Sequence, residues 1–254
     1  MTGLAKLTWP QAQEFFAPGS IAIVPIGSTE PHGPHLPLDT DVTIAAEQAA
    51  RAATKLAAAG VRAFVLPPLA YGLTNWTEGF AGRVTLRPGT LWALLEDIVL
   101  ALEREGVRQI VFSNAHLEPE HVQVLRGVAM DHPERTREDA QVLFVDVTRR
   151  KIAETLGEEF RSGDCHAGRY ESSLVMAADP QAVREEERRA LPAVRIDLLE
   201  KMKAGIASFR QAGAERGYCG DPAAASATEG EALYELLSDR IVSACRETWP
   251  DLFR

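Results

Sequence analysis

Four short apolar segments alternate with helical patterns along the first part of the chain, and this alternation limits the folds that the chain can adopt. Each segment is rich in Val, Ile, Leu or Phe, which favours a buried strand. The segments between them lack the strand pattern and instead repeat apolar residues with a helical period. Such alternation indicates a mostly parallel sheet with helices on both faces, an α/β fold. The expected strands are residues 21–26, 61–68, 107–113 and 141–147, and the expected helices between them are residues 42–60, 90–106 and 119–130.

The rest of the chain is less regular. Helical patterns cover residues 168–178, 196–211 and 228–248, a charged stretch covers 181–190, and a Gly- and Ala-rich loop covers 212–228. The sequence contains neither an internal repeat nor a linker that would divide it, and 254 residues suit one large α/β domain. We therefore expect a single domain that spans residues 1–254.

Charge and cysteine content narrow the environments in which the protein is expected to work. The net charge is −9, from 27 basic and 36 acidic residues, with no basic run, which argues against nucleic acids and anionic membranes as partners. No apolar stretch approaches the ~18 residues of a membrane-spanning helix, and the N-terminal segment does not read as a secretory signal. Three cysteines without a CxxC pair favour a reducing cytoplasm.

Two pairs of a histidine and a carboxylate follow the first and third expected strands. Glu30 and His32 form one pair, and His116 and Glu118 form the other, each with a spacing of i, i+2. In an extended segment this spacing puts both side chains on one face. Loops beyond the carboxyl ends of parallel strands converge on one edge of the sheet, so the two pairs are expected to meet there. Asp41 follows the Pro-rich loop and adds a third carboxylate.

Two imidazoles and three carboxylates can hold two divalent ions if one carboxylate bridges them. Ions ~3.5–4 Å apart activate a shared water and polarise a carbonyl or phosphoryl oxygen. Nitrogen and oxygen ligands suit Zn, Mn, Fe or Co and argue against thiolate zinc and iron–sulfur sites. Either pair alone is more simply read as polar loop residues, and only the combination with Asp41 favours a metal site. His121 and His132, which lie in or after a helical pattern, are interpreted as structural.

Four sequence blocks, in order, resemble the motifs of the creatininase family of metal-dependent amidohydrolases. GSTEPHGPHLPLDTD (Gly27–Asp41) resembles its signature, and PPLAYGLTNWTEGFAGRVTL (Pro67–Leu86) resembles the next block. IVFSNAHLE (Ile110–Glu118) resembles its Asn-Gly-His block, and HAGRYESSLVM (His166–Met176) its His-Ala-Gly-x-x-Glu-Thr-Ser block. The resemblance implies a compact α/β fold, a two-metal site with Zn, Mn or Fe, and a homohexamer.

The resemblance also assigns roles to individual residues. Glu30, Asp41 and His116 would hold one metal, and His32, Asp41 and Glu118 would hold the other, with Asp41 as the bridge. His166 falls where the family has a group beside the scissile bond, and we expect it to give or take a proton. Glu171 would orient His166 or a water, although a carboxylate at a helix start has an equally good structural explanation. Thr74 falls at a position where the family has a small hydroxyl residue near the substrate.

The departures from the family pattern concern the substrate. The Asn-Gly-His segment reads Asn114-Ala115-His116, and no Trp lies between Trp92 and Trp249, with Ser162 at a place where creatinine-hydrolysing members have one. We therefore expect hydrolysis of a C–N bond in a small cyclic amide or formamide, but not creatinine, by a hydroxide held between two metals. The alternatives are a deformylase or peptidase of the same family, and a non-catalytic oligomer stabilised by metal. Cys165, next to His166, is interpreted as a buried bystander rather than a nucleophile.

Overall fold

The centre of the protein is a sheet of four parallel strands in the order β2-β1-β3-β4. The computed structural model describes residues 3–135 and 140–254. The strands are β1 (Ile21–Ile26), β2 (Ala63–Val65), β3 (Gln109–Asn114) and β4 (Gln141–Phe144), as the apolar segments predict. Ile26 pairs with Asn114, so β1 and β3 end side by side at the same edge of the sheet. The loops that carry both histidine pairs therefore start from adjacent points.

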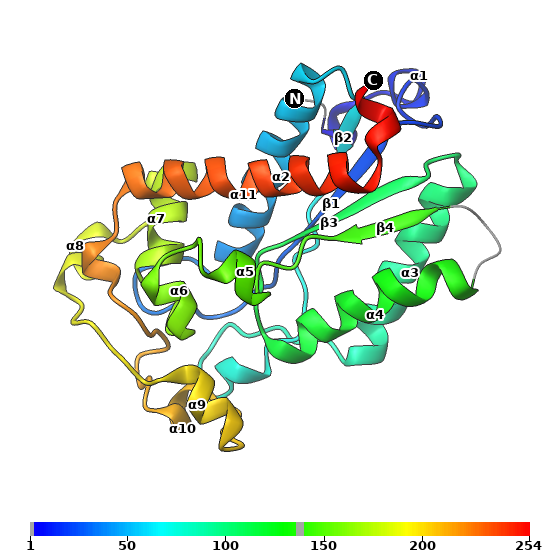
Figure 1. The fold of residues 1–254 in the computed structure, drawn as a ribbon. Coiled ribbons are helices and arrows are strands. Elements are labelled where there is room, and N and C mark those ends of the chain that lie inside the picture. Colours follow the sequence, from blue (N-terminus) through cyan, green and yellow to red (C-terminus); the bar gives the residue numbers. More distant parts are fainter. Residues whose placement is uncertain (1–2, 136–139) are drawn as a thin grey trace.

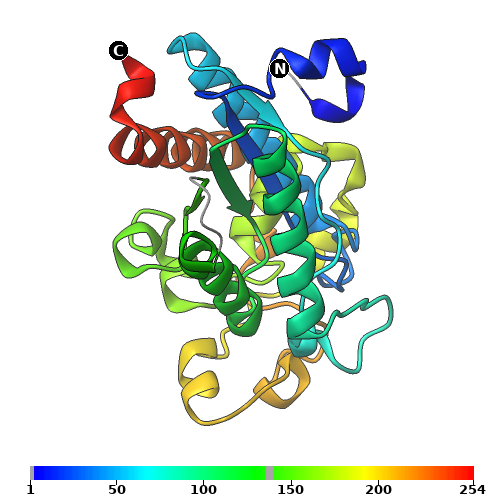
Figure 2. The same ribbon diagram turned by 90° about the vertical axis from the view of Figure 1, so that its right-hand side faces the viewer.

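Helices cover both faces of this sheet, which confirms the expected α/β class (Figures 1 and 2). α2 (Thr40–Ala58) and α11 (Ala227–Thr248) pack on the face that carries Ile21 and Ile23. α3 (Pro88–Arg104) and α4 (Pro119–Arg135) pack on the opposite face, with Ala22 and Val24 in the same apolar cluster. The alternation of β1 side chains between two cores explains why all six of its residues are buried and apolar.

The second half of the chain builds a cap around the carboxyl edge of the sheet. α7 (Arg169–Ala178) packs against α11 and α2, and the helices approach so closely that a Cβ on Gly230 would collide with the carbonyl oxygen of Ser173. α9 (Leu198–Lys203) and α10 (Phe209–Ala212) form a small apolar cluster at the bottom of the molecule in Figure 1. The remaining helices are α1 (Trp9–Gln13), α5 (Arg150–Ala153), α6 (Glu158–Ser162) and α8 (Glu185–Ala190), with 3-10 turns at Leu4–Lys6, Asn75–Thr77, Pro180–Ala182, Pro222–Ala224 and Pro250–Phe253.

Two expectations for this half are wrong in detail. The helix expected over residues 196–211 is two short helices, because the hydroxyl of Ser208 accepts a hydrogen bond from the Gln211 N–H and starts a new helix. The charged stretch over residues 181–190 contains a helix, α8, in which Arg188 forms an ion pair with Glu185. No helix among the described residues is long and apolar enough to cross a membrane.

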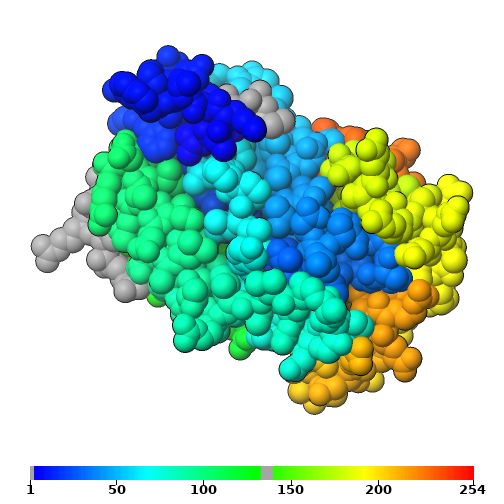
Figure 3. Space-filling model, turned by 180° about the vertical axis from the view of Figure 1, so that it is seen from behind, coloured from blue at the N-terminus to red at the C-terminus, as the bar shows by residue number. Residues whose placement is uncertain are grey.

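The segment after β2 lies against the segment after β1. The backbone N–H of Val84 donates to the carbonyl of Thr29 at 3.1 Å, and Leu69 forms an isolated parallel bridge with Ile26. Figure 3 shows this from behind, where the cyan segment after β2 runs beside the blue segment after β1. The segment after β2 thus shields the loop that bears Glu30 and His32 from solvent on that side, and His32 is fully buried.

Candidate metal centre

A close approach between β1 and α2 brings Asp41 to the end of the sheet. The loop after β1 folds back on itself, and the Glu30 N–H donates to the Leu38 carbonyl at 3.0 Å. Gly27 makes this possible, because a Cβ there would lie 2.5 Å from the backbone nitrogen of Val42. Asp41 then lies in the first turn of α2, next to the loop that carries Glu30.

The first group of possible ligands combines Glu30, Asp41 and His116, which are all buried. His116 Nδ1 lies 3.1 Å from Glu30 Oε1 and 2.9 Å from Asp41 Oδ2. Its other nitrogen, Nε2, lies 2.5 Å from the carbonyl oxygen of Leu73. A carbonyl only accepts, so Nε2 carries the proton and Nδ1 can turn a lone pair toward the carboxylates.

The second group combines His32, Asp41 and Glu171, again all buried. His32 Nε2 lies 3.2 Å from Asp41 Oδ1 and 3.5 Å from Glu171 Oε2. His32 Nδ1 donates to the carbonyl of Glu30 at 3.0 Å, which fixes this ring as the Leu73 carbonyl fixes His116. Asp41 therefore turns one oxygen to each histidine, the arrangement that a bridging carboxylate needs.

These two groups fit divalent ions. His32 Nε2 is buried without a hydrogen-bond partner among the described residues. Burial alone would lower the pKa of His32, but the carboxylates of Asp41 and Glu171 outweigh burial and raise it to about 10. Buried carboxylates this close together are stabilised by a positive charge between them. Metal-binding histidines commonly donate the N–H of the other ring nitrogen to a carbonyl, as His32 and His116 do here. The structure thus offers six ligand atoms in two groups, with Asp41 shared.

Two hydroxyl groups that the sequence analysis missed hold the carboxylates in place. Ser28 Oγ donates to Asp41 Oδ2 at 2.7 Å, and Thr77 Oγ1 donates to Glu30 Oε2 at 3.1 Å. Both hydroxyl residues are fully buried. Ser28 lies inside the quoted signature block, yet nothing in the sequence shows which way its side chain points.

The expected metal ligand Glu118 and the expected orienting group Glu171 lie in different surroundings, and their roles stay predictions. Glu171, expected as an orienting group, lies in the second ligand group, and its Oε2 also accepts from the Ala167 N–H at 2.6 Å. Glu118, expected as a ligand, belongs to neither group. It lines the adjacent cavity, where its Oε2 accepts from the Trp76 N–H at 3.1 Å and burial raises its pKa to about 7. The geometry therefore favours Glu171 over Glu118 as the partner of His32.

His166 lies beside the candidate centre. Its ring stacks on Phe209, with centroids 4.2 Å apart, and its Nε2 donates to the carbonyl of Pro31 at 3.0 Å. Burial, followed by the charge on His32, lowers the pKa of His166 to about 4. In a third possible group, Glu30, His32 and His166, the ligand atoms lie within 4.8 Å of one another. The imidazole of His166 is therefore adjacent to residues of both ligand groups.

The remaining residues are Thr74, which the resemblance places near the substrate, and three residues interpreted from the sequence as structural or as a bystander, His121, His132 and Cys165. Thr74 is fully buried and does not line the cavity described below. His121 Nε2 bonds to Asn114 Oδ1 at 3.0 Å, and His132 lies 3.3 Å from Glu103, in keeping with structural roles for both. Burial raises the pKa of the Cys165 thiol well above its ordinary value, so the thiolate that a nucleophile requires is disfavoured.

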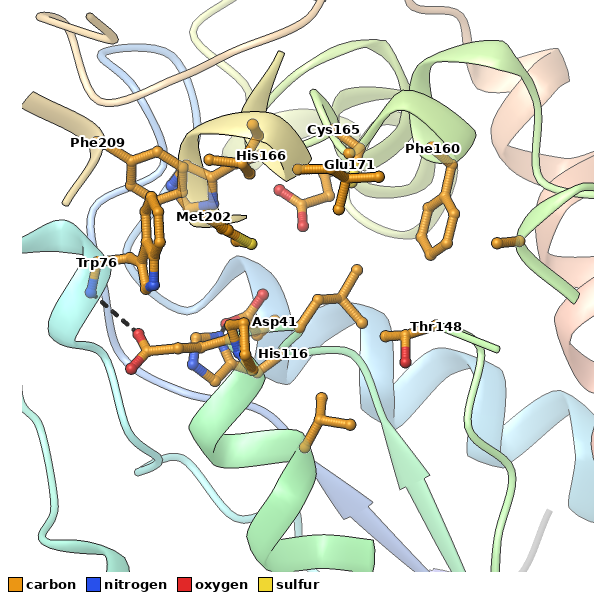
Figure 4. Close-up of a pocket in the computed structure, with 18 of the residues that line it drawn as sticks. Asp41, Trp76, His116, Thr148, Phe160, Cys165, His166, Glu171, Met202 and Phe209 are labelled. Carbon is orange, nitrogen blue, oxygen red and sulfur yellow. Dashed lines mark hydrogen bonds and ion pairs between the residues drawn. The ribbon is translucent and has the colours of Figure 1, made fainter. Parts of the chain in front are cut away.

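The candidate centre opens into a cavity of about 340 Å³. In the view of Figure 4, Trp76, Met202 and Phe209 lie on one side of Asp41 and His116, and Phe160 and Thr148 lie on the other. Most of the wall is apolar, and its further apolar residues are Leu117, Pro119, Val122, Ala153, Leu198 and Leu199. Aromatic side chains thus line the cavity, although position 162, where creatinine-hydrolysing members have a tryptophan, is a serine.

The fold and these residues define an α/β protein with a candidate binuclear metal centre. A profile described as creatininase, creatinine amidohydrolase, matches residues 5–245, so the chain belongs to the creatininase family of hydrolases. The chain is 33% identical to a mycofactocin precursor peptide peptidase of Mycolicibacterium smegmatis, over 91% of this chain and 86% of that protein. It is 27% identical to a creatinine amidohydrolase of Pseudomonas putida, over 71% of this chain and 73% of that protein.

Solved structures agree in fold. A crystal structure of creatinine amidohydrolase superposes with a TM-score of 0.77 at 23% identity, covering 98% of each chain. A putative creatinine amidohydrolase from Bacteroides fragilis gives a TM-score of 0.76 at 23% identity, covering 100% of this chain and 96% of that one. Other similar structures are described as a Mn form and as a Zn-Zn type of creatininase.

Proposed function

We propose that the protein is a metal-dependent hydrolase that cleaves an amide bond in a short peptide. The observation that carries this proposal is the shared carboxylate of Asp41, which turns one oxygen to His32 and one to His116 at the floor of a largely apolar cavity. Glu30 and His116 complete one ligand set, and His32 and Glu171 complete the other. This grouping replaces the assignment of Glu118 as a ligand.

The chain's own residues have separate tasks in this proposal. Zn or Mn bound in the two groups would polarise the amide carbonyl and lower the pKa of a bound water. Trp76 and Phe209 form the wall next to the ligands and exclude bulk water from the amide. His166 and Glu118 are the titratable side chains that line the cavity next to the two ligand groups. We assign to His166, which is neutral near pH 7, the relay of a proton from the attacking water to the departing nitrogen. Glu118, fixed by the Trp76 N–H, is the next candidate.

A peptide is favoured over the small cyclic amide or formamide that the sequence analysis expects first. The cavity extends to both sides of Asp41 and His116, with apolar side chains at each end, so it can hold residues on both sides of a scissile bond (Figure 4). The mycobacterial relative is named for a precursor peptide, and its 33% identity to this chain exceeds the 27% of the creatinine amidohydrolase from Pseudomonas putida. A small cyclic amide or formamide is the alternative substrate, and the substrate panel below distinguishes it from a peptide.

The test is a substrate panel with metal-loaded protein. Blocked apolar tripeptides, cyclic amides such as hydantoin and creatinine, and N-formyl amino acids are incubated with protein loaded with Zn or Mn. We expect peptide cleavage, loss of turnover with a chelator, recovery on addition of metal, and no turnover by Asp41→Asn. Turnover of only the cyclic amides or formamides would instead support the small-amide hydrolase that the sequence predicts. Metal binding without turnover of any class would favour the non-catalytic oligomer.

The assembly and compartment are proposed on the family resemblance and composition alone. A homohexamer in the cytoplasm agrees with the resemblance and with the absence of CxxC pairs in the sequence. Light scattering coupled to gel filtration measures the assembly directly, and a mass of one or two chains would overturn the hexamer.

A further inference from the structure

Two arginines line the end of the cavity that lies beyond the candidate metal centre. Arg126 belongs to α4, Arg161 belongs to α6, and Thr148 and Phe160 lie at the same end (Figure 4). Apart from the carboxylates of the ligand groups and Glu118, the described residues that line the cavity include no acidic side chain. This end of the cavity therefore differs in charge from the floor.

The guanidinium of Arg126 is held in a fixed position. Its Nε donates to Asp146 Oδ2 at 2.7 Å, and its Nη2 donates to Thr148 Oγ1 at 3.0 Å. The Asp146 side chain is 1% exposed, whereas that of Arg126 is 43% exposed. The buried carboxylate thus anchors one edge of the guanidinium, and the partly exposed side chain keeps access to the cavity.

Arg161 is anchored through its backbone but not through its side chain. It is exposed, and in the described part of the chain its guanidinium forms no ion pair or hydrogen bond. The preceding residue, Phe160, is buried and packs edge-on against Tyr170 with centroids 4.8 Å apart, which fixes this turn of α6. The guanidinium of Arg161 is therefore available for a ligand that enters the cavity.

Asp146, which anchors Arg126, lies close to a second arginine. Arg149 lies 3.6 Å from Asp146, so that carboxylate is shared between two arginines, and Arg150 and Lys151 follow directly in the sequence. Arg126 and Arg161 are the arginines that line the cavity, whereas Arg149, Arg150 and Lys151 do not line it. Two guanidinium groups in a cavity wall attract anionic ligands and orient them as they enter.

We infer that Arg126 and Arg161 form a carboxylate-binding subsite, and that the preferred substrate is a peptide with a carboxylate beyond the scissile amide. Guanidinium groups bind carboxylates through paired N–H donors, which gives both affinity and orientation. The carboxylate can come from the chain terminus or from an acidic side chain. The inference deepens the proposed function and depends on it for the identity of the scissile bond.

Three matched peptides test the inference on metal-loaded protein. They share the same apolar residues and end in a free carboxylate, in a neutral amide, or in a neutral amide preceded by Asp. A hydrogen-bonded charge contributes about 1.5–3 kcal/mol, so kcat/KM for a carboxylate peptide should exceed that for the neutral amide about 10- to 150-fold. Comparison of the two charged peptides shows whether the terminus or the side chain is recognised.

The variant Arg161→Gln should remove most of this preference, so that kcat/KM for the carboxylate peptides falls toward that for the neutral amide. Arg150→Gln is the matched control, because Arg150 is 91% exposed, pairs with Glu154 and does not line the cavity. The control removes the same charge nearby and should keep the preference. An unchanged preference in Arg161→Gln, or equal kcat/KM for all three peptides in the parent protein, overturns the inference.

The result also separates this inference from the proposed function. If none of the peptides is cleaved, the proposed function fails, and calorimetric binding of the acid and amide peptides still decides the subsite. Tighter binding of the acid by the parent protein, lost in Arg161→Gln and kept in Arg150→Gln, supports it. Equal binding of acid and amide, or a preference that survives in Arg161→Gln, overturns it.

Discussion

Ser28 Oγ donates a hydrogen bond of 2.7 Å to Asp41 Oδ2, the oxygen that lies 2.9 Å from His116 Nδ1. The other oxygen of Asp41 faces His32. The hydroxyl thus holds the carboxylate in the one orientation in which each oxygen faces a different imidazole. Ser28 lies at the start of the loop after β1 and Asp41 lies in the first turn of α2, so this bond also ties together the two ends of the segment that carries Glu30 and His32.

Ser28→Ala should weaken metal binding about 10- to 100-fold, because Asp41 loses the donor that orients it. Metal affinity is measured by competition with a coloured chelator. Ser20→Ala is a matched control, since Ser20 is equally buried but its hydroxyl has no partner among the described residues. Equal metal affinity in both variants would show that the hydroxyl does not position Asp41.

Metal analysis should give two divalent ions per chain, with different losses in different variants. Asp41→Ala should lose both ions because it removes the shared ligand, whereas Glu171→Ala should lose one and keep the ion held by Glu30 and His116. Elemental analysis after gel filtration checks these values. A single ion at saturation in the parent protein, or two ions retained in Glu171→Ala, would contradict the grouping.

His166→Ala should keep its metal content and thermal midpoint but lose about 10²–10⁴-fold in rate, as expected for a positioned proton-transfer group. His116→Ala, which removes a ligand, should instead lose metal together with activity. Loss of metal in His166→Ala would make His166 a ligand. Nearly full activity in that variant would transfer the role to Glu118.

Creatinine should be turned over more slowly than the best peptide of the panel. The aromatic walls of this cavity come from Trp76, Phe160 and Phe209, while position 162 carries a serine that cannot close over a flat ring. Creatinine turnover equal to that of the best peptide would show that enclosure by a tryptophan is unnecessary.

Gly230→Ala should lower the free energy of unfolding by about 1–3 kcal/mol, the usual cost of overpacking. The added methyl group would collide with the Ser173 carbonyl where α11 crosses α7. Gly89→Ala in α3 is the control, because nothing lies within 4 Å of its Cβ position and alanine favours a helix. Urea denaturation of both variants checks the difference, and equal midpoints would show that the two helices can shift apart.

The sequence predicts those parts of the fold and site that depend on local pattern. The apolar segments identify all four strands of the sheet, and the i, i+2 pairs after two strands identify Glu30, His32 and His116 as neighbours at one edge. Local pattern does not decide whether Glu118 or Glu171 is the carboxylate partner of His32. The choice depends on how α7 docks on α2 and α11, and no spacing within the chain encodes that docking.

The aromatic residues of the cavity wall could not be predicted from the sequence, for a similar reason. Trp76 and Phe209 are far apart in the sequence, and their rings meet edge-on at 5.6 Å only because α10 folds under the segment after β2. The position of Phe209 in the cavity wall was also not predicted, because a single helix over residues 196–211 would point that ring in a different direction from the separate helix that begins after Ser208. Long-range packing, rather than residue type, decides these contacts.

The two ligand groups join segments from the end of β1, the start of α2, the end of β3 and the start of α7. Bound ions would therefore act as crosslinks between distant parts of the chain, and crosslinks over long loops restrict the unfolded ensemble most. α7 could then detach from α2 and α11 only after a metal bond breaks. Slow release of that helix would make the loaded protein resist proteases far longer than the stripped one, so metal supply would govern how long the molecule survives.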